Sequence, residues 1–438
     1  MRFRVAFVLG LGLWCVAARW PAQVTTPLSA PLSAQGGGMF LGSTEDLAIK
    51  YATAPLDNPV VAVNQKLADG TIRLTLDGRG GYLQSALQAF DIPIESQLLV
   101  FSPTSLQARL INPGNPRALF FNDRVVVGYV RGGEILEVAA QDATAGIVFY
   151  TLEQKAGAAP EFRRVTTCLG CHLNADTLGV PGLLMFSTTP ASATRPARST
   201  MMDHRMPLKD RWGGWFVTGS GGRTAHIGNQ VPALDGRGNR EIASAAGLFE
   251  PDGFRATTSD IAALMVFSHQ TYMTNLITRA GWEARAADPR LHPPFAAAPG
   301  EDDRIAEVMR GIANEVVDYL LFIDETPLTD RIRGGSGFAE RFSAAGPWDR
   351  QGRSLHQLDL GRRLMMYPCS YVIYSPAFDQ LPAGARDAIY KRLWEVLSGA
   401  ERQARYRSAL SLADRQAIAG ILRDTKPGLP SYFRDVTR

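Results

Sequence analysis

The spacing of apolar residues changes near residue 160, and the first part of the chain favours a mixed, β-rich region. Apolar runs that suit strands occur in SQLLVFS, ALFFNDRVVVGYVRGGEILEVAA and AGIVFYTLEQ. The second of these contains two β-rich runs joined by Arg131-Gly132-Gly133, which is typical of a hairpin. A short helix is expected in GGYLQSALQAFDIP. We therefore predict a small α+β domain with an antiparallel sheet over residues 43–160.

Beyond residue 160 the pattern favours helices separated by long loops. Residues 173–256 are rich in Gly, Pro, Ser and Thr, which indicates loops. Apolar residues then recur with helical spacing over 259–284, 302–324, 384–398 and 412–424. We predict a mainly helical, loop-rich domain over residues 161–438, so the expected fold class is α+β.

The first 42 residues have the composition of a targeting segment and a lead-in. Two early arginines precede the uncharged apolar run VAFVLGLGLWCVAA, which is shorter than the ~20 residues of a membrane-spanning helix. Residues 1–18 are therefore predicted to be a signal peptide, and the Pro-, Ala-, Ser- and Gly-rich residues 19–42 a flexible lead-in. Lipidation at Cys15 and an uncleaved anchor are the alternatives. The expected location is periplasmic or secreted, and no later segment has the pattern of a transmembrane helix.

Composition and charge narrow the class of protein. The chain has 438 residues, of which 45% are hydrophobic and 20% charged, as in a globular protein with a substantial core. Its 46 basic and 42 acidic residues are spread along the chain without a basic run, which argues against nucleic-acid binding. After cleavage only Cys168, Cys171 and Cys369 remain, a poor framework for disulfides.

The most unusual chemistry lies in TCLGCH, where Cys168, Cys171 and His172 stand at positions i, i+3 and i+4. On one helical turn these side chains share a face, so two thiols can form thioethers to one haem while the imidazole reaches its iron. C-x-x-C-H is the signature of c-type haem attachment, which takes place outside the cytoplasm. The alternatives are a structural zinc site, a dithiol redox site, or a chance grouping of residues.

Four segments together resemble a known family. They are TCLGCH, RWGGWFVTGSGGRTAHIGN, HQTYMTNLITRAGWEAR and YPCSYVIYSPAFDQLP. From about residue 80 onward the chain is similar to large bacterial exported proteins that carry a single-haem cytochrome c domain. The resemblance implies a β-containing N-terminal region, one covalent haem c and a long helical remainder, with electron transfer as the general activity. The single motif separates this chain from di-haem peroxidases.

The second axial position of such an iron has several candidate ligands, which are His269, Met273, His226 and His204. His269 and Met273 lie one turn apart on a predicted helix, but a histidine on an apolar face is often only a core residue. His204 and His226 lie in the loop-rich segment and equally suit the bracing of a loop. Met365 and Met366 are a weaker possibility, because a Met pair there also suits core packing. His292 and His356 are expected to be surface or structural residues.

Other residues near the motif also allow two interpretations. The arginines between it and the WGGW segment suit haem propionates, but equally a solvated basic loop; they are Arg195, Arg198, Arg205 and Arg211. Trp212 and Trp215 flank two glycines that suit either a close approach to the haem or a tight turn between packed indoles. Cys369 lies among aromatic and aliphatic residues, so a buried, reduced thiol is expected.

The predicted function is that of an exported c-type cytochrome with one haem. Its partner would be a redox protein or a small-molecule electron donor or acceptor. The length of the chain exceeds what a simple carrier needs, which leaves a haem-dependent, peroxidase-like oxidoreductase with an open or displaceable distal site as the alternative. A haem-based sensor or docking subunit is a third possibility.

Overall fold

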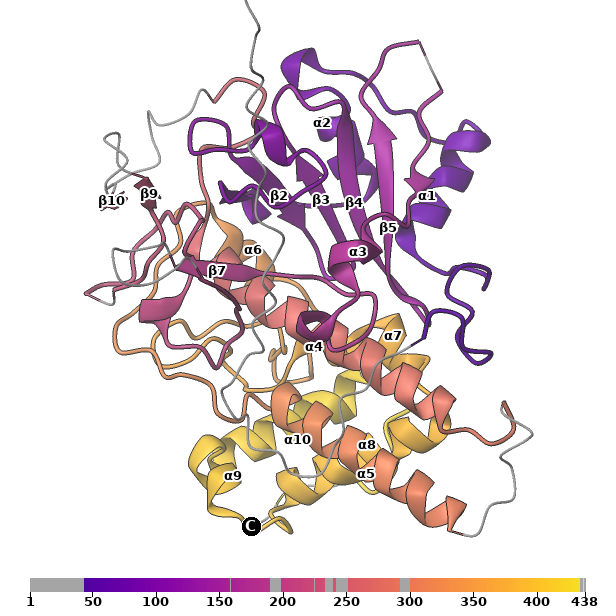
Figure 1. Cartoon of the computed structure of the whole chain (residues 1–438). Helices are drawn as coiled ribbons and strands as arrows, with labels where there is room; N and C mark the ends of the chain where they lie inside the picture. The colour runs from indigo at the N-terminus through magenta and orange to yellow at the C-terminus, as the bar shows by residue number, and fades with distance from the viewer. Residues whose placement is uncertain are drawn as a thin grey trace, which may run out of the picture. The chain divides into compact units, whose positions relative to one another are not determined.

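The predicted combination of an antiparallel sheet and a helical region is present in the structure, which confirms the α+β fold class (Figure 1). This computed structural model describes residues 43–157, 159–189, 198–223, 225–232, 239–241, 251–291, 300–433 and 436, all within one compact unit, Gly38–Arg438. The predicted signal peptide (1–18) and lead-in (19–42) lie outside the described residues.

The N-terminal region is built on a six-stranded sheet in which each strand pairs with the next along the chain. Its strands are β1 (Leu98–Val100), β2 (Arg117–Phe121), β3 (Val125–Tyr129), β4 (Ile135–Asp142), β5 (Gly146–Glu153) and β6 (Arg163–Arg164). The sequence predicts two strands in residues 118–140, but this stretch contributes to three, β2, β3 and β4. The first predicted run is divided by a turn at Asn122. Its side-chain oxygen accepts hydrogen bonds from the backbone N–H groups of Arg124 and Val125.

The two faces of the sheet enter two different hydrophobic cores, because successive side chains of a strand point to opposite faces. On one face, Phe120 and Val138 pack with α1 (Pro59–Ala68) and α2 (Leu83–Ala89). On the other, Phe121 and Phe149 join the larger core that also contains the later helices; this second face positions the site described below.

Helix α4 (Ile261–Ala286) crosses that second face and packs both on the sheet and on later helices (Figure 1). Phe267 packs on Phe121 with ring centroids 4.8 Å apart, and the Gln270 amide donates to the carbonyl of Asn122. The helix starts at Asp260, whose carboxylate accepts from the first free backbone N–H groups. Helix α4 is enclosed on most of its circumference, and its buried residues include polar ones such as His269, Gln270 and Asn275.

The remaining helices follow α4 in the chain, and several of them pack on it. They are α5 (Glu301–Leu320), α6 (Phe338–Ser343), α7 (Pro376–Asp379), α8 (Ala383–Ser398), α9 (Ala404–Ala409) and α10 (Leu412–Thr425). The four predicted helices are confirmed as α4, α5, α8 and α10. Helix α5 ends four residues before its predicted end, where Phe322 and Asp324 turn the chain with φ of 56° and 67°. Helices α6, α7 and α9 were not predicted, because they are too short for a periodic pattern.

The segment between the sheet and α4 is mostly irregular, as expected. It contains α3 (Leu169–His172) and two small pairs of strands: β7 (Phe186–Thr189) with β8 (Arg198–Met201), and β9 (Gln230–Pro232) with β10 (Asn239–Glu241). The last strand of the sheet ends at Arg164, four residues after the predicted domain boundary. None of the helices in the described ranges is both long and apolar enough to cross a membrane.

Candidate functional site

The two motif cysteines lie on a single turn of helix. The backbone N–H groups of Cys171 and His172 both donate to the carbonyl of Cys168, at 3.1 and 2.9 Å, and α3 covers Leu169–His172. Both thiols are free, Cys168 half-buried and Cys171 exposed. Burial is the largest influence on the pKa of Cys168 and raises it. The turn therefore presents two unpaired thiols, one of them at the surface.

The imidazole of His172 is held in one orientation by the chain that follows the motif. Its Nδ1 lies 2.9 Å from the carbonyl oxygen of Gly182, and its ring packs on Phe149 with centroids 4.8 Å apart. Burial lowers the pKa of His172, and the hydrogen bond to Gly182 only partly opposes this, so the ring is neutral at pH 7. Because a carbonyl oxygen can only accept, the proton is on Nδ1, and Nε2 keeps a lone pair.

Helix α4 fixes the carbonyl that holds His172. Asn275 of α4 accepts from the backbone N–H of Leu183 and donates to its carbonyl, both at 2.8 Å. A Cβ atom at Gly182 would lie 2.5 Å from Oδ1 of Asn275, so only glycine leaves room for this contact. Sequence reasoning missed Asn275 and Gly182; a buried amide in an apolar helix was the available signal.

These features suit a covalently attached haem. Unpaired thiols three residues apart on one turn are the groups that form the thioethers, and a neutral histidine with a free Nε2 lone pair is the form that ligates a metal. Its Nδ1–H donates to a carbonyl, which fixes the tautomer, as for many metal-bound histidines. Among the described residues, no three His, Cys, Asp or Glu side chains are grouped closely enough to hold a metal ion by themselves.

Two of the distal candidates, His204 and His269, contact one another. Their Nδ1 atoms are 2.8 Å apart, and Nε2 of His269 lies 2.8 Å from the hydroxyl of Ser370. Both imidazoles are buried and pack against the rings of Tyr319 and Phe322. Both nitrogens of His269 are therefore engaged in hydrogen bonds within the protein.

His204 differs from His269 in keeping one ring nitrogen unbonded. Within the described part of the chain, its Nε2 is buried without a hydrogen-bond partner. Its backbone carbonyl accepts from Arg211 at 2.9 Å and from the N–H of Thr326 at 3.1 Å. The contacts of His204 and His269 thus involve a different set of residues from those of His172.

The other predicted ligands are also located. Met273 is fully buried in the core around α4, and His226 packs edge-on against Trp212 with centroids 5.3 Å apart. Met365 is buried, whereas Met366 is 38% exposed. His356 is a buried structural residue whose Nε2 lies 3.3 Å from a carboxylate oxygen of Asp123. His292 lies outside the described residues.

Two of the four arginines near the motif bind protein groups. Arg205 pairs with Asp203 and lies over the rings of Tyr272 and Tyr319. Arg211 is buried, donates to two backbone carbonyls, and has its pKa lowered by burial to about 10. Arg198 is exposed on β8, and Arg195 lies outside the described residues.

The WGGW segment forms a tight turn against β7. Trp212 has a φ of 68°, and the N–H of Trp215 donates to its carbonyl. A Cβ at Gly213 would lie 2.2 Å from the carbonyl oxygen of Thr188, so the glycine permits close approach to a strand. Both indoles are buried, which matches the interpretation as a turn between packed side chains.

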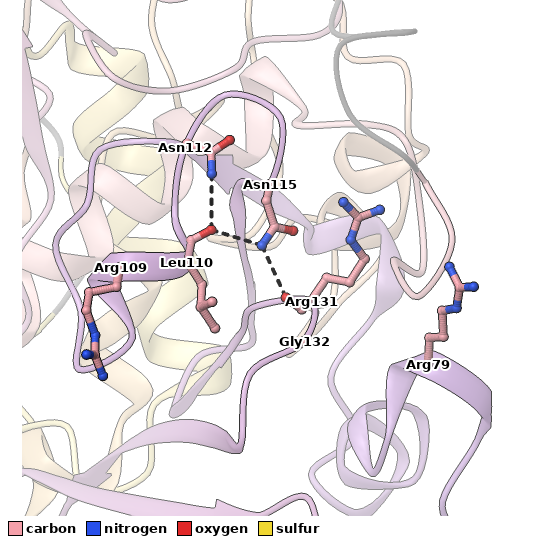
Figure 2. A pocket seen from close by; sticks show the side chains of 7 residues that line it. All are labelled: Arg79, Arg109, Leu110, Asn112, Asn115, Arg131 and Gly132. Atoms are coloured by element: carbon pink, nitrogen blue, oxygen red, sulfur yellow. Dashed lines mark hydrogen bonds between the residues drawn. The ribbon is translucent and has the colours of Figure 1, made fainter.

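A basic hollow lies beside the turn between β3 and β4. It has a volume of about 650 Å³ and is lined by Arg79, Arg109, Leu110, Asn112, Asn115, Arg131 and Gly132 (Figure 2). Asn115 ties its wall together by donating to the carbonyls of Leu110 and Arg131. None of the predicted site residues lines it.

The structure therefore joins Cys168, Cys171 and His172 in one turn and His204 with His269 in a buried pair. Met273 and His226 belong to neither group. Comparisons with protein-family models, with curated proteins and with solved structures found no match for the chain.

Proposed function

We propose that this protein is an exported c-type cytochrome that carries one covalent haem and transfers electrons. The observation that carries the proposal is the helical turn with two free thiols followed by His172, whose Nδ1 is bonded to Gly182. A histidine with a purely structural role would need neither a fixed tautomer nor two unpaired thiols beside it. The apolar N-terminal run supports the export that haem attachment requires.

Each residue of the turn has a separate task. Cys168 and Cys171 provide the sulfur atoms for two thioethers, and His172 provides Nε2 as the proximal iron ligand. Gly182 keeps the proton of the ring on Nδ1, and Asn275 keeps the carbonyl of Gly182 in place. When bound, the haem would supply a one-electron couple for a redox partner protein or a small-molecule donor or acceptor.

Covalent attachment is the decisive test of this proposal. The full chain is produced in a host with a cytochrome c maturation system and examined by haem staining after denaturing electrophoresis. Wild-type protein should keep its haem, each of Cys168→Ala and Cys171→Ala should weaken attachment, and the double variant should lose it. Cys369→Ala is the matched control and should stain as strongly as wild type. A colourless wild-type protein would contradict the proposal.

One observation favours a haem-dependent, peroxidase-like oxidoreductase as the second candidate. Both ring nitrogens of His269 are hydrogen-bonded, and the His204 ring is wedged between aromatic rings. If these contacts persist in the holoprotein, His269 is not the second axial ligand, and His204, another residue or an exchangeable ligand takes that place. Electron paramagnetic resonance of the ferric protein separates the candidates: a high-spin signal with rapid cyanide binding supports the oxidoreductase, and a low-spin signal the carrier.

A further inference from the structure

A mostly buried ion pair lies on the same face of the sheet as Phe149, the residue on which the His172 ring packs. Arg117 of β2 and Glu137 of β4 approach to 2.5 Å between Nη2 and Oε2, with 19% and 11% of their side chains exposed. The backbone N–H of Leu106 donates to the second carboxylate oxygen at 3.0 Å. Two charges held this far from water each depend on the other for compensation.

The sheet has a gap that accommodates the guanidinium group. Gly128 of β3 lies between the two strands and pairs with Leu119 on one side and Glu137 on the other. A Cβ atom at Gly128 would come within 2.6 Å of Nη2 and 2.9 Å of Nε of Arg117. The absence of a side chain at Gly128 leaves room for the guanidinium group, and Arg117 lies across β3 to reach Glu137.

The register places this pair close to the motif. Glu137 pairs with Thr151, and Ala139 pairs with Phe149, so Glu137 and Phe149 are diagonal neighbours on one face. The backbones of two such diagonal neighbours are roughly 7–8 Å apart. The ring of Phe149 packs directly on His172. Burial is the largest influence on the pKa of Cys168 and raises it. Glu137 raises this pKa further and Arg117 lowers it, so both charges act electrostatically on the motif.

We propose that Arg117 and Glu137 shift the reduction potential of the haem in opposite directions, and that their pairing holds it near the value it would have without either charge. This inference rests on the proposed function. A nearby cation disfavours the ferric state and raises the potential, whereas an anion lowers it. In the intact pair these influences largely cancel. Either charge without its partner would act strongly on the haem, because both side chains are mostly shielded from water.

Potentiometric titration of the full-length holoprotein tests the proposal. Glu137→Gln leaves the arginine unopposed and should raise the midpoint potential, while Arg117→Gln should lower it. The double variant should return towards the wild-type value, and Arg117→Lys should remain closer to wild type than Arg117→Gln. Glu401→Gln is the matched control, because Glu401 forms a similarly buried pair with Arg392 at 2.7 Å, in the α8 region. It should leave the potential unchanged.

A second pair of variants keeps the test valid if removing one partner prevents folding. Thr151 faces Glu137 across the strands and is half-buried, so a charge there lies on the same face while both members of the ion pair are retained. Thr151→Lys should raise the potential and Thr151→Glu should lower it.

Haem staining, read first, separates the two hypotheses. A wild-type protein without covalent haem would overturn the proposed function and this inference together. Variants that hold haem with potentials equal to wild type, or shifted in the same direction, would overturn only the role of the ion pair.

Discussion

A single buried amide, Asn275, links helix α4 to the carbonyl that holds His172. Asn275→Ala removes both hydrogen bonds to Leu183, and we expect a loss of about 1–3 kcal/mol in the free energy of unfolding because two backbone groups lose their partners. The Gly182 carbonyl should then move, so the absorption spectrum of the holoprotein should change as well. Urea unfolding and visible spectroscopy on the same sample measure both effects.

Asn64 offers a matched control for this variant. Its side chain bridges the backbone N–H and carbonyl of Phe162 in the same manner, but on α1. Asn64→Ala should cost similar stability and leave the spectrum unchanged. If both variants alter the spectrum equally, Asn275 has no particular link to His172.

The thiol of Cys369 should be unreactive in the folded protein. It is completely buried, and burial raises its pKa, so very little thiolate is available to an alkylating reagent. Iodoacetamide followed by mass spectrometry should label it only after unfolding, at a rate that follows the concentration of denaturant. Rapid labelling of the native holoprotein would mean that the segment around Cys369 opens readily.

At the scale of elements, the His204–His269 contact joins the loop after β8 to α4, and Ser370 joins α4 to the segment before α7. Burial holds the pKa values of both histidines well below their usual range. In the unfolded chain both imidazoles have a pKa of about 6.5. Below that pH the unfolded state takes up protons that the folded state excludes, so the free energy of unfolding should fall as the pH drops.

This dependence can be measured by urea unfolding between pH 5 and pH 8. Stability contributed by the pair should be complete above about pH 7 and decrease steadily below about pH 6.5. Replacing both histidines, by His204→Gln and His269→Gln, should lower stability at pH 8 and flatten the slope on the acidic side. An unchanged slope in the double variant would assign the pH dependence to other groups.

An element or contact can be predicted from the sequence when the residues that determine it lie close together along the chain. Helix α4 and the strands around Phe149 were predictable because their apolar spacing is local. The motif turn was predictable because Cys168, Cys171 and His172 are near neighbours. The His204–His269 contact spans 65 residues and the Ser370 contact 101, so spacing along the chain could not reveal either. For the same reason, the two histidines were considered only as separate candidates for one iron.

At the scale of the whole molecule, the sheet and the later helices share one core. Phe121 and Phe149 of the sheet pack in the same cluster as α4, α5 and α8, although the apolar pattern alone predicts two domains that meet near residue 160. If that core is the main source of stability, loss of sheet and loss of helix should coincide in one thermal transition. Phe121→Ala should shift both signals together, at a cost of about 3–5 kcal/mol.

A truncated chain provides the sharper test of this coupling. A fragment of residues 43–164 keeps the sheet, α1 and α2, but it uncovers the apolar face on which α4 packs. That face includes Leu98, Val100, Leu119, Phe121, Ile147 and Phe149. A continuous apolar surface of this kind favours association over independent folding. We therefore expect the fragment to aggregate or to lack a cooperative thermal transition by circular dichroism, whereas residues 43–438 should melt sharply. A monomeric fragment with a sharp transition would instead mean that the sheet folds as a separate domain, as the sequence pattern predicts, and that α4 only docks onto it.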